Sequence, residues 1–260
     1  MTEISAEFLA LHRGSEPLLL PNAWDLGSAK ILVAAGFSAI ATTSSGFAAT
    51  LGRPDGAVTR EEAIGHAAAV AAAIAVPVSA DLEQGFADDP EGVADTIRSA
   101  AAAGLAGGSI EDWSGSRLYD PSAAADRIAA AVQAAGDDFV LTARAENYLH
   151  GRRDLADTID RLQRYQQAGA QVLYAPGLSD PGEIASLVAS VDRPVNVLLR
   201  PTGPTVPQLA ALGVARVSVG CAFAFAALGA LTEAAAQFRA GEGDFWRLVG
   251  LGGSAADSAF

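Results

Sequence analysis

Residues 77–110, PVSADLEQGFADDPEGVADTIRSAAAAGLAGGSI, contain one complete repeat of the pattern that decides the fold. Pro77–Ala80 is a short run that predicts a strand. Glu91 begins a helical stretch and lies in its first turn, where an acid interacts favourably with the helix dipole. The helix stops at Gly104, a typical C-terminal cap, just before the next strand candidate, Gly107–Ile110. The segment therefore predicts a strand–helix–strand unit.

The same alternation continues along the chain. The remaining strand candidates are Pro17–Leu20, Ala39–Thr42, Phe139–Thr142, Val172–Tyr174, Pro194–Leu198 and Arg216–Val219. Eight strands with helices between them predict one α/β domain over residues 1–260, a closed (β/α)8 TIM-type barrel, for which this length is ordinary. An open doubly wound sheet also alternates strands and helices, but no glycine-rich dinucleotide fingerprint follows an early strand here.

Composition excludes several classes of partner. The net charge of −13 argues against nucleic acid and against a polybasic membrane surface. The N-terminus is polar, with Glu3 and Glu7, and lacks the pattern of a signal peptide. The Ala-rich stretch 67–75 is too short to span a bilayer, and the single cysteine, Cys221, allows no disulfide within the chain. We therefore expect a cytoplasmic protein without membrane or nucleic-acid partners.

The C-terminal tail, residues 244–260, is unusually apolar for a chain end. It contains Phe245, Trp246, Leu248 and Val249 before a small polar end. Such side chains need a surface to cover them. We expect this tail to pack on a neighbouring subunit.

Polar residues gather after the predicted strands, where the active site of such a barrel lies. They are Trp24 and Asp25 after the first strand, Ser45 and Gly46 after the second, Asp81 and Glu83 after the third, Glu111 and Asp112 after the fourth, Arg144 and Glu146 after the fifth, and Asn196 in the seventh. Carboxylates that converge at one mouth need a cation between them, and hard oxygen ligands favour Mg²⁺, with Mn²⁺ the alternative. Arg144 has the planar fork that binds a substrate carboxylate.

Structural interpretations stand beside these functional ones. Asp25 is expected to be a helix N-cap, and Asp112 could cap a helix or bond a loop amide. Arg144 could form a structural ion pair with Glu146 or Glu111. Convergence favours function, because capping does not require acids after adjacent strands at one mouth.

In their order along the chain, these residues resemble the isocitrate lyase and phosphoenolpyruvate mutase superfamily. The resemblance covers roughly residues 20–220 and rests on Pro21-Asn22-Ala23-Trp24-Asp25, Ser45-Gly46, Leu51-Gly52-Arg53-Pro54-Asp55, Ala80-Asp81-Leu82-Glu83-Gln84-Gly85-Phe86, Ser109-Ile110-Glu111-Asp112 and Ala143-Arg144-Ala145-Glu146. It implies that Asp81 is the acid closest to Mg²⁺ and that Glu83 and Glu111 hold the ion largely through water.

The resemblance also implies the substrate contacts. Ser45, Gly46 and Arg144 are expected to grip the substrate carboxylate, with Asn196 nearby. Trp24 and Phe47 are expected beside them in the substrate site. Asp55 matches a catalytic acid on the segment after the second strand. The family exchanges its C-terminal helix between subunits, which implies a homodimer or homotetramer.

Two departures from the family bear on the reaction. The lyases carry a cysteine in the lid after the fourth strand, whereas the stretch here, 113–120, contains no Cys, Lys or His. The general acid could be Tyr119 or a water, or the reaction could have no dedicated general acid. Thr43 stands where 2-methylisocitrate lyases have Tyr. The expected function is Mg²⁺-dependent cleavage of a C–C bond in a small 2-oxo or 2-hydroxy acid.

Two other functions remain open. Phosphonopyruvate chemistry would need cations near the lid, for which Arg117 and Arg200 are the candidates. A barrel that binds a 2-oxo acid without turnover is the second.

Overall fold

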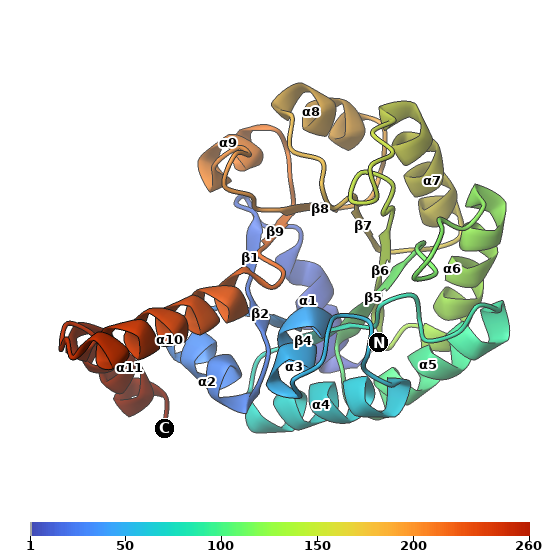
Figure 1. Cartoon of the computed structure of the whole chain (residues 1–260). Helices are drawn as coiled ribbons and strands as arrows, with labels where there is room; N and C mark the ends of the chain where they lie inside the picture. Colours follow the sequence, from blue (N-terminus) through green and yellow to red (C-terminus); the bar gives the residue numbers. More distant parts are fainter. Residues whose placement is uncertain (1) are drawn as a thin grey trace.

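The computed structural model describes residues 2–260, and their nine strands form one parallel sheet that closes into a barrel (Figure 1). The strands are β1 (Leu18–Leu20), β2 (Asn22–Ala23), β3 (Ile40–Thr42), β4 (Val78–Asp81), β5 (Gly107–Glu111), β6 (Val140–Arg144), β7 (Val172–Tyr174), β8 (Val195–Leu198) and β9 (Arg216–Ser218). Each overlaps a predicted strand except β2. The (β/α)8 barrel is therefore confirmed.

The first strand of the barrel is divided into β1 and β2, so the eight barrel strands carry nine labels. β1 pairs with β9, and β2 pairs with β3. Pro21 stands between them and has no N–H group to donate, although its carbonyl still accepts from the Ala41 amide at 2.9 Å. The two short strands together complete the ring of eight.

Helices surround the barrel and follow the strands in turn (Figure 1). They are α1 (Glu3–Leu11), α2 (Leu26–Ala34), α3 (Ser44–Thr50), α4 (Arg60–Ala73), α5 (Pro90–Ala102), α6 (Pro121–Ala135), α7 (Leu155–Gln167), α8 (Pro181–Ala189), α9 (Val206–Ala211), α10 (Ala222–Ala240) and α11 (Trp246–Ala259). Asp25 caps α2, as predicted, by accepting from the Ser28 amide. Among residues 2–260, no helix has the length and apolar character needed to cross a membrane.

The core has two parts because the barrel strands are buried on both faces. The larger part lies between strands and outer helices and includes Ile40, Leu141 and Ile184. The smaller part, around Phe8, closes the amino-terminal end of the barrel under α1. Gly107 lets this region close, since a Cβ there would lie 2.5 Å from the Val140 carbonyl oxygen.

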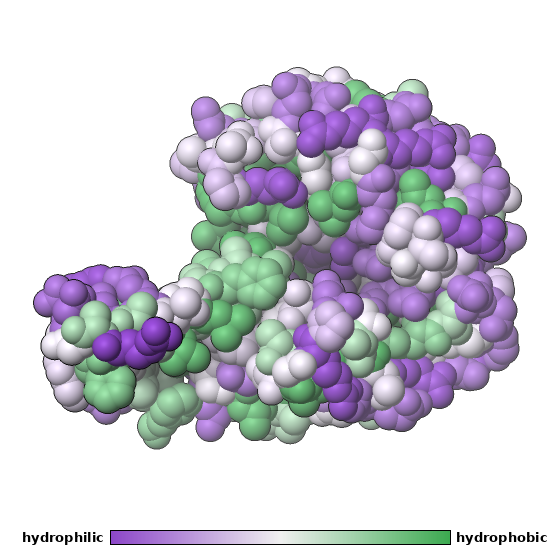
Figure 2. Space-filling model, in the orientation of Figure 1, coloured by the Kyte–Doolittle hydropathy of each residue, from purple (hydrophilic) through white to green (hydrophobic). Residues whose placement is uncertain are grey.

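The last two helices project from the barrel as an arm (Figure 1). Within the chain, α11 turns back against α2, where Phe260 lies near Gly27 and Lys30. Many large apolar side chains of the arm remain exposed, including Leu231 at 65% and Phe238 at 75%. Figure 2 shows apolar residues gathered along α10 beside a hollow in the surface.

Candidate active site

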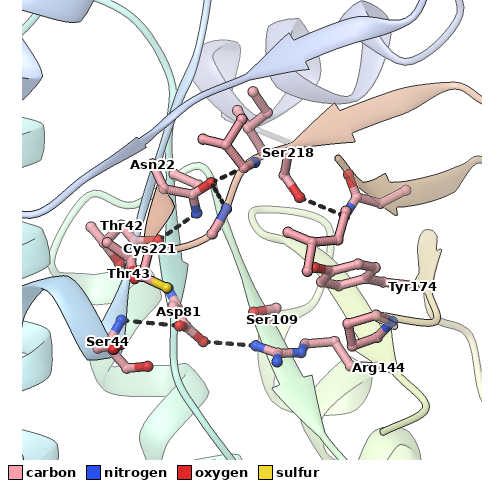
Figure 3. Close-up of a pocket in the computed structure, with 18 of the residues that line it drawn as sticks. Asn22, Thr42, Thr43, Ser44, Asp81, Ser109, Arg144, Tyr174, Ser218 and Cys221 are labelled. Atoms are coloured by element: carbon pink, nitrogen blue, oxygen red, sulfur yellow. Dashed lines mark hydrogen bonds and ion pairs between the residues drawn. The ribbon is translucent and has the colours of Figure 1, made fainter. Parts of the chain in front are cut away.

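A cavity of about 340 Å³ opens at the carboxyl ends of the strands (Figure 3). Five of the residues predicted from sequence line it, namely Ser45, Asp55, Asp81, Arg144 and Asn196. Asp81 and Arg144 end β4 and β6, Asn196 lies within β8, Ser45 lies at the start of α3 after β3, and Asp55 follows α3. The barrel therefore brings together side chains that lie as far apart as 45 and 196 in sequence.

Arg144 lies at the centre of a cluster of acids. Its Nη1 donates to Asp81 Oδ1 at 3.0 Å, its Nη2 lies 3.1 Å from Glu111 Oε2, and its Nε donates to Glu146 Oε1 at 2.7 Å. Burial opposes the positive charge, but the acids, Glu146 first, outweigh it and raise the pKa of Arg144 above its ordinary value. The ion pairs considered as structural alternatives are thus both present.

Asp81 is held by the neighbouring strand as well as by Arg144. The Ser44 amide donates to Asp81 Oδ2 at 3.0 Å, and the Asp81 amide donates to Thr42 Oγ1 at 2.9 Å. Figure 3 shows the carboxylate between Ser44 and Arg144. Because both carboxylate oxygens already accept hydrogen bonds, the side chain is fixed toward the cavity.

Glu83 lies behind this cluster, outside the cavity lining, and it is strained. Its φ of +48° is in the left-handed region that side chains other than glycine rarely adopt, a feature that concentrates at functional sites. Its Oε1 is buried without a hydrogen-bond partner. Burial, and then the charges of Asp81 and Asp55, raise the pKa of Glu83 to about 7.

Carboxylate oxygens are the ligands that a hard cation prefers, but the Arg144 guanidinium contacts two of these acids, Asp81 and Glu111. Within residues 2–260, no group of three or more His, Cys, Asp or Glu side chains stands in a metal-holding arrangement. Burial raises the pKa of Glu111 well above its ordinary value, with Arg144 opposing that shift. The unpartnered Glu83 oxygen and an all-oxygen donor set nonetheless fit Mg²⁺ better than zinc.

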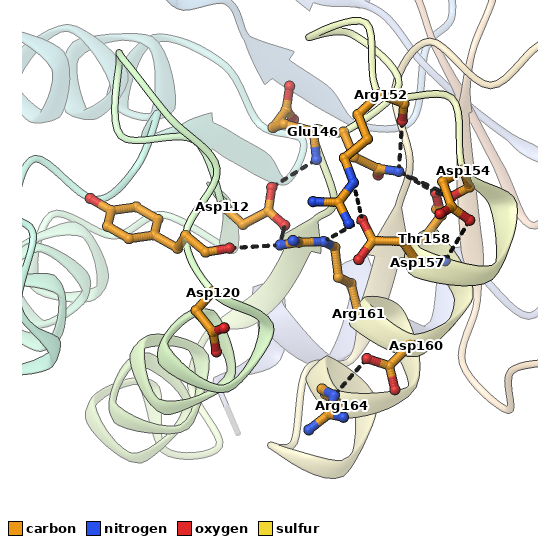
Figure 4. A network of polar contacts seen from close by, with 12 residues as sticks. Asp112, Asp120, Glu146, Arg152, Asp154, Asp157, Thr158, Asp160, Arg161 and Arg164 are labelled. Carbon is orange, nitrogen blue, oxygen red and sulfur yellow. Dashed lines mark hydrogen bonds and ion pairs between the residues drawn. The ribbon is translucent and has the colours of Figure 1, made fainter.

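Asp112 is separated from the cavity in spite of its place beside Glu111. It accepts from the Glu146 amide at 2.8 Å and from Arg161 Nη1 at 2.9 Å (Figure 4). It also accepts from the Tyr165 hydroxyl at 2.6 Å. The bond to a loop amide, one of the predicted structural roles, is confirmed. Both Asp112 and Arg161 are almost fully buried, so the pair joins β5 to α7.

The segment after β5 does not bring Tyr119 to the cavity. Its hydroxyl donates to Asp88 Oδ1, and burial raises the pKa of Tyr119 to about 12. Trp113 pairs with Leu118 in a small bridge and stacks on His150, with ring centroids 3.5 Å apart. The segment is therefore a short closed turn.

The other predicted substrate-binding residues, Trp24, Gly46 and Phe47, are not among the residues that line the cavity. Trp24 and Gly46 line a separate apolar pocket of about 210 Å³ between α3 and α10. Phe47 stacks on His66, with ring centroids 3.9 Å apart. The Gly46 amide donates to Thr43 Oγ1 at 3.3 Å, so it serves the helix cap.

The cavity residues that were not singled out from the sequence include Tyr174, Ser218, Arg216 and Cys221. The first three lie within β7 and β9 rather than after them. Burial raises the pKa of Tyr174 to about 12, and the Arg144 guanidinium carbon lies 5.4 Å from its ring centre. The alternation of inward-facing and outward-facing residues along each strand could have identified them, because inward-facing residues also occur within the strands.

A barrel with a polar cavity at the carboxyl ends of its strands has the layout of a (β/α)8 enzyme. The family model for phosphoenolpyruvate phosphomutase matches residues 8–239, and the chain belongs to this family. The predicted membership of the isocitrate lyase and phosphoenolpyruvate mutase superfamily is thereby confirmed. Members of this superfamily are enzymes.

Known proteins support the assignment. A protein of Burkholderia cenocepacia J2315 of known structure is 52% identical, with a TM-score of 0.88 over 91% of this chain and 87% of that one. The 2-methylisocitrate lyase of Escherichia coli is 30% identical, over 76% of this chain and 70% of the enzyme. The structure of phosphonopyruvate hydrolase with oxalate and Mg²⁺ is 27% identical, with a TM-score of 0.83 over 93% of this chain and 89% of that one.

Proposed function

We propose that this protein is a Mg²⁺-dependent lyase that cleaves a carbon–carbon bond in a small 2-hydroxy or 2-oxo di- or tricarboxylic acid. The reaction would be of the isocitrate or 2-methylisocitrate lyase type, or of the oxaloacetate decarboxylase type. The observation that carries the proposal is the meeting of Asp81 and Arg144 in one cavity. The likeness to a 2-methylisocitrate lyase supports the choice of reaction.

The metal would be held by Asp81, Glu83 and Glu111, with Mn²⁺ as an alternative to Mg²⁺. The buried, unpartnered Oε1 of Glu83 supports this, because an oxygen without a donor is costly unless a cation or a proton reaches it. A bound Mg²⁺ would supply Lewis-acid stabilisation of an oxygen that gains negative charge. The known complex of a relative with oxalate and Mg²⁺ is consistent with this ligand chemistry.

Arg144 would hold the substrate carboxylate. A carboxylate ligand would compete with Asp81 for the Nη1 group, which now donates to Oδ1 at 3.0 Å. The hydroxyl of Ser45 and the amide of Asn196 would orient the ligand from two sides of the cavity. Trp24, Gly46 and Phe47 would shape the wall behind Ser45.

The proposed reaction needs one group that accepts a proton and another that donates one. Asp55 is exposed at the rim, and its carboxylate would accept the hydroxyl proton of a 2-hydroxy acid as the carbon–carbon bond breaks. We infer that the product carbanion takes its proton from water, because the Tyr119 hydroxyl donates to Asp88 and lies outside the cavity lining.

Phosphonopyruvate chemistry is the second candidate. It is favoured by Arg200, which lines the cavity and could contact a phosphonate, and by the likeness to phosphonopyruvate hydrolase. Arg117 is not among the lining residues. Because only one of the two arginines predicted near the lid, Arg200, lines the cavity, carbon–carbon cleavage remains the first proposal.

A proton and phosphorus NMR time course tests the function. The protein with Mg²⁺ would be mixed with isocitrate, 2-methylisocitrate, oxaloacetate and phosphonopyruvate, beside an Asp81→Asn control. Loss of one carbon acid in the wild type alone supports the proposal, and loss of phosphonopyruvate alone favours the second candidate. No turnover above the Mg²⁺-only rate, with oxaloacetate binding in calorimetry, indicates a non-catalytic binder.

We also propose that the arm covers a neighbouring subunit, giving a homodimer or homotetramer. The exposed apolar side chains of α10 and α11 are the support, because contiguous patches of this kind mark interaction sites. A cytoplasmic location agrees with the single free cysteine, Cys221.

A further inference from the structure

Arg216 places a guanidinium at the floor of the cavity. It is 3% exposed, at the first position of β9, and it lines the cavity. Pairing registers run from Arg144 to Tyr174, from Tyr174 to Asn196 and from Asn196 to Arg216. Paired residues of parallel strands face the same side of the sheet, so all four side chains point into the barrel. Figure 3 shows Tyr174 and Ser218 of the neighbouring wall.

Neutral groups hold this guanidinium. Its Nε donates to Asn196 Oδ1 at 3.0 Å, its Nη2 donates to Thr142 Oγ1 at 3.2 Å, and its Nη1 lies 3.1 Å from His12 Nε2. Because His12 Nδ1 lies 2.8 Å from the Phe8 carbonyl, Nδ1 carries the proton and Nε2 accepts. Burial, and then the charge of Arg216, lower the pKa of His12 to about 3, so the ring is neutral.

No acid balances the charge. Among residues 2–260, no carboxylate lies within 4.0 Å of the Arg216 guanidinium, whereas the Arg144 guanidinium contacts three. Burial lowers the pKa of Arg216 to about 10, which leaves it charged at neutral pH. The contacts use three of its five N–H groups. A buried charge without a counterion is costly, and an anion in the cavity would remove that cost.

We propose that Arg216 binds a second carboxylate of the ligand, so that the cavity selects small dicarboxylic acids over monocarboxylic acids. The inference rests on the proposed function for the place of the ligand. Arg144 is already neutralised by Asp81, Glu111 and Glu146, which leaves Arg216 as the stronger attraction for an added anionic group. A planar guanidinium with free N–H groups also matches carboxylate geometry.

Calorimetry with succinate and propionate tests the inference, because the two acids differ by one carboxylate. We expect the wild-type protein to bind succinate at least about tenfold more tightly, the size of one charge-assisted hydrogen bond. Arg216→Met should reduce that ratio to about threefold or less, and Arg216→Lys should keep part of it. The matched control is Arg127→Met, which removes a guanidinium that is 2% exposed but outside the cavity.

Several outcomes would overturn the inference. If the wild-type protein binds succinate and propionate with equal affinity, the inference is overturned. This result needs no variant, so it can be obtained even if Arg216→Met fails to fold. The inference is also overturned if a folded Arg216→Met protein keeps the wild-type ratio of succinate affinity to propionate affinity. If sodium chloride, but not sodium gluconate, stabilises only the wild type while the acid ratio stays unchanged, the site takes an inorganic anion instead. Because binding is measured without turnover, a protein that proves catalytically inactive can still support the inference.

Discussion

Arg144 Nη1 lies 3.0 Å from Asp81 Oδ1, so the cation expected to bind a substrate carboxylate and the acid expected to bind a metal are paired with each other. The guanidinium also reaches Glu111 and Glu146. The cluster therefore contains its own counterion. Ligand and metal must both redistribute these contacts, and this makes the cluster the most informative place for substitutions.

Asp81→Asn keeps the shape of the side chain and removes its charge. We expect activity to fall by about a hundredfold or more, since the group lies where charge is stabilised. Mg²⁺ affinity, measured by calorimetry, should fall as well. Asp88→Asn is the matched control, because Asp88 follows the same strand but bonds Tyr119 outside the cavity. Equal loss in both variants would contradict the role of Asp81.

Arg144→Met should destabilise the fold. It leaves Glu146, which is 1% exposed, without a charged partner, and breaking a buried ion pair costs about 3–5 kcal/mol. The free energy of unfolding in urea measures this. Adding Glu146→Gln should restore part of the loss, because it removes the orphaned charge. Additive losses in the double variant would show that the two residues are not coupled.

Asp112→Asn should affect stability without affecting the metal. Arg161 would lose its buried carboxylate partner at 2.9 Å, at a cost of about 3 kcal/mol. Mg²⁺ affinity should stay within about twofold of the wild type, since Asp112 faces α7 rather than the cavity. A fall in Mg²⁺ affinity as large as that of Asp81→Asn would mean that Asp112 belongs to the site.

His12 gives the protein a defined dependence on pH. Its pKa is lowered from 6.5 to about 3 in the folded protein, so between these values the unfolded chain binds the extra proton. Stability from this group is therefore present above pH 6.5 and is lost as pH falls toward 3, by about 2 kcal/mol between pH 7 and 5. His12→Gln can keep both hydrogen bonds and should flatten the urea-unfolding profile over that range. An unchanged slope would contradict the assignment.

The exposed arm predicts association. Leu231→Glu with Phe238→Glu places charges at positions that are 65% and 75% exposed in the single chain. If these side chains are covered by a second copy, sedimentation should show a shift from dimer or tetramer toward monomer. Leu19→Glu, at another exposed apolar position, should leave the mass unchanged. A wild-type protein that sediments as a monomer would contradict the proposed association through the arm.

The sequence by itself determined the fold and indicated several of the charged residues that line the cavity or contact Arg144. Short apolar runs alternating with glycine-terminated helices place all eight barrel strands, because periodicity and capping are local properties. Only the split at Pro21 was missed, since pairing on both sides of a proline depends on the neighbouring strands. The chemistry-bearing residues Asp81, Glu111 and Arg144 could also be read from strand ends.

Only the tertiary structure decided which of those residues share a surface. Glu111 and Asp112 are adjacent in sequence, yet one contacts Arg144 at the barrel mouth and the other contacts Arg161 on α7. Closure of the barrel sets the direction of each side chain, and successive residues of a strand point to opposite faces. The charge of Arg216 is left without a counterion for the same reason. Its neutral partners Asn196, Thr142 and His12 come from β8, β6 and the end of α1, and these elements meet only in the folded barrel.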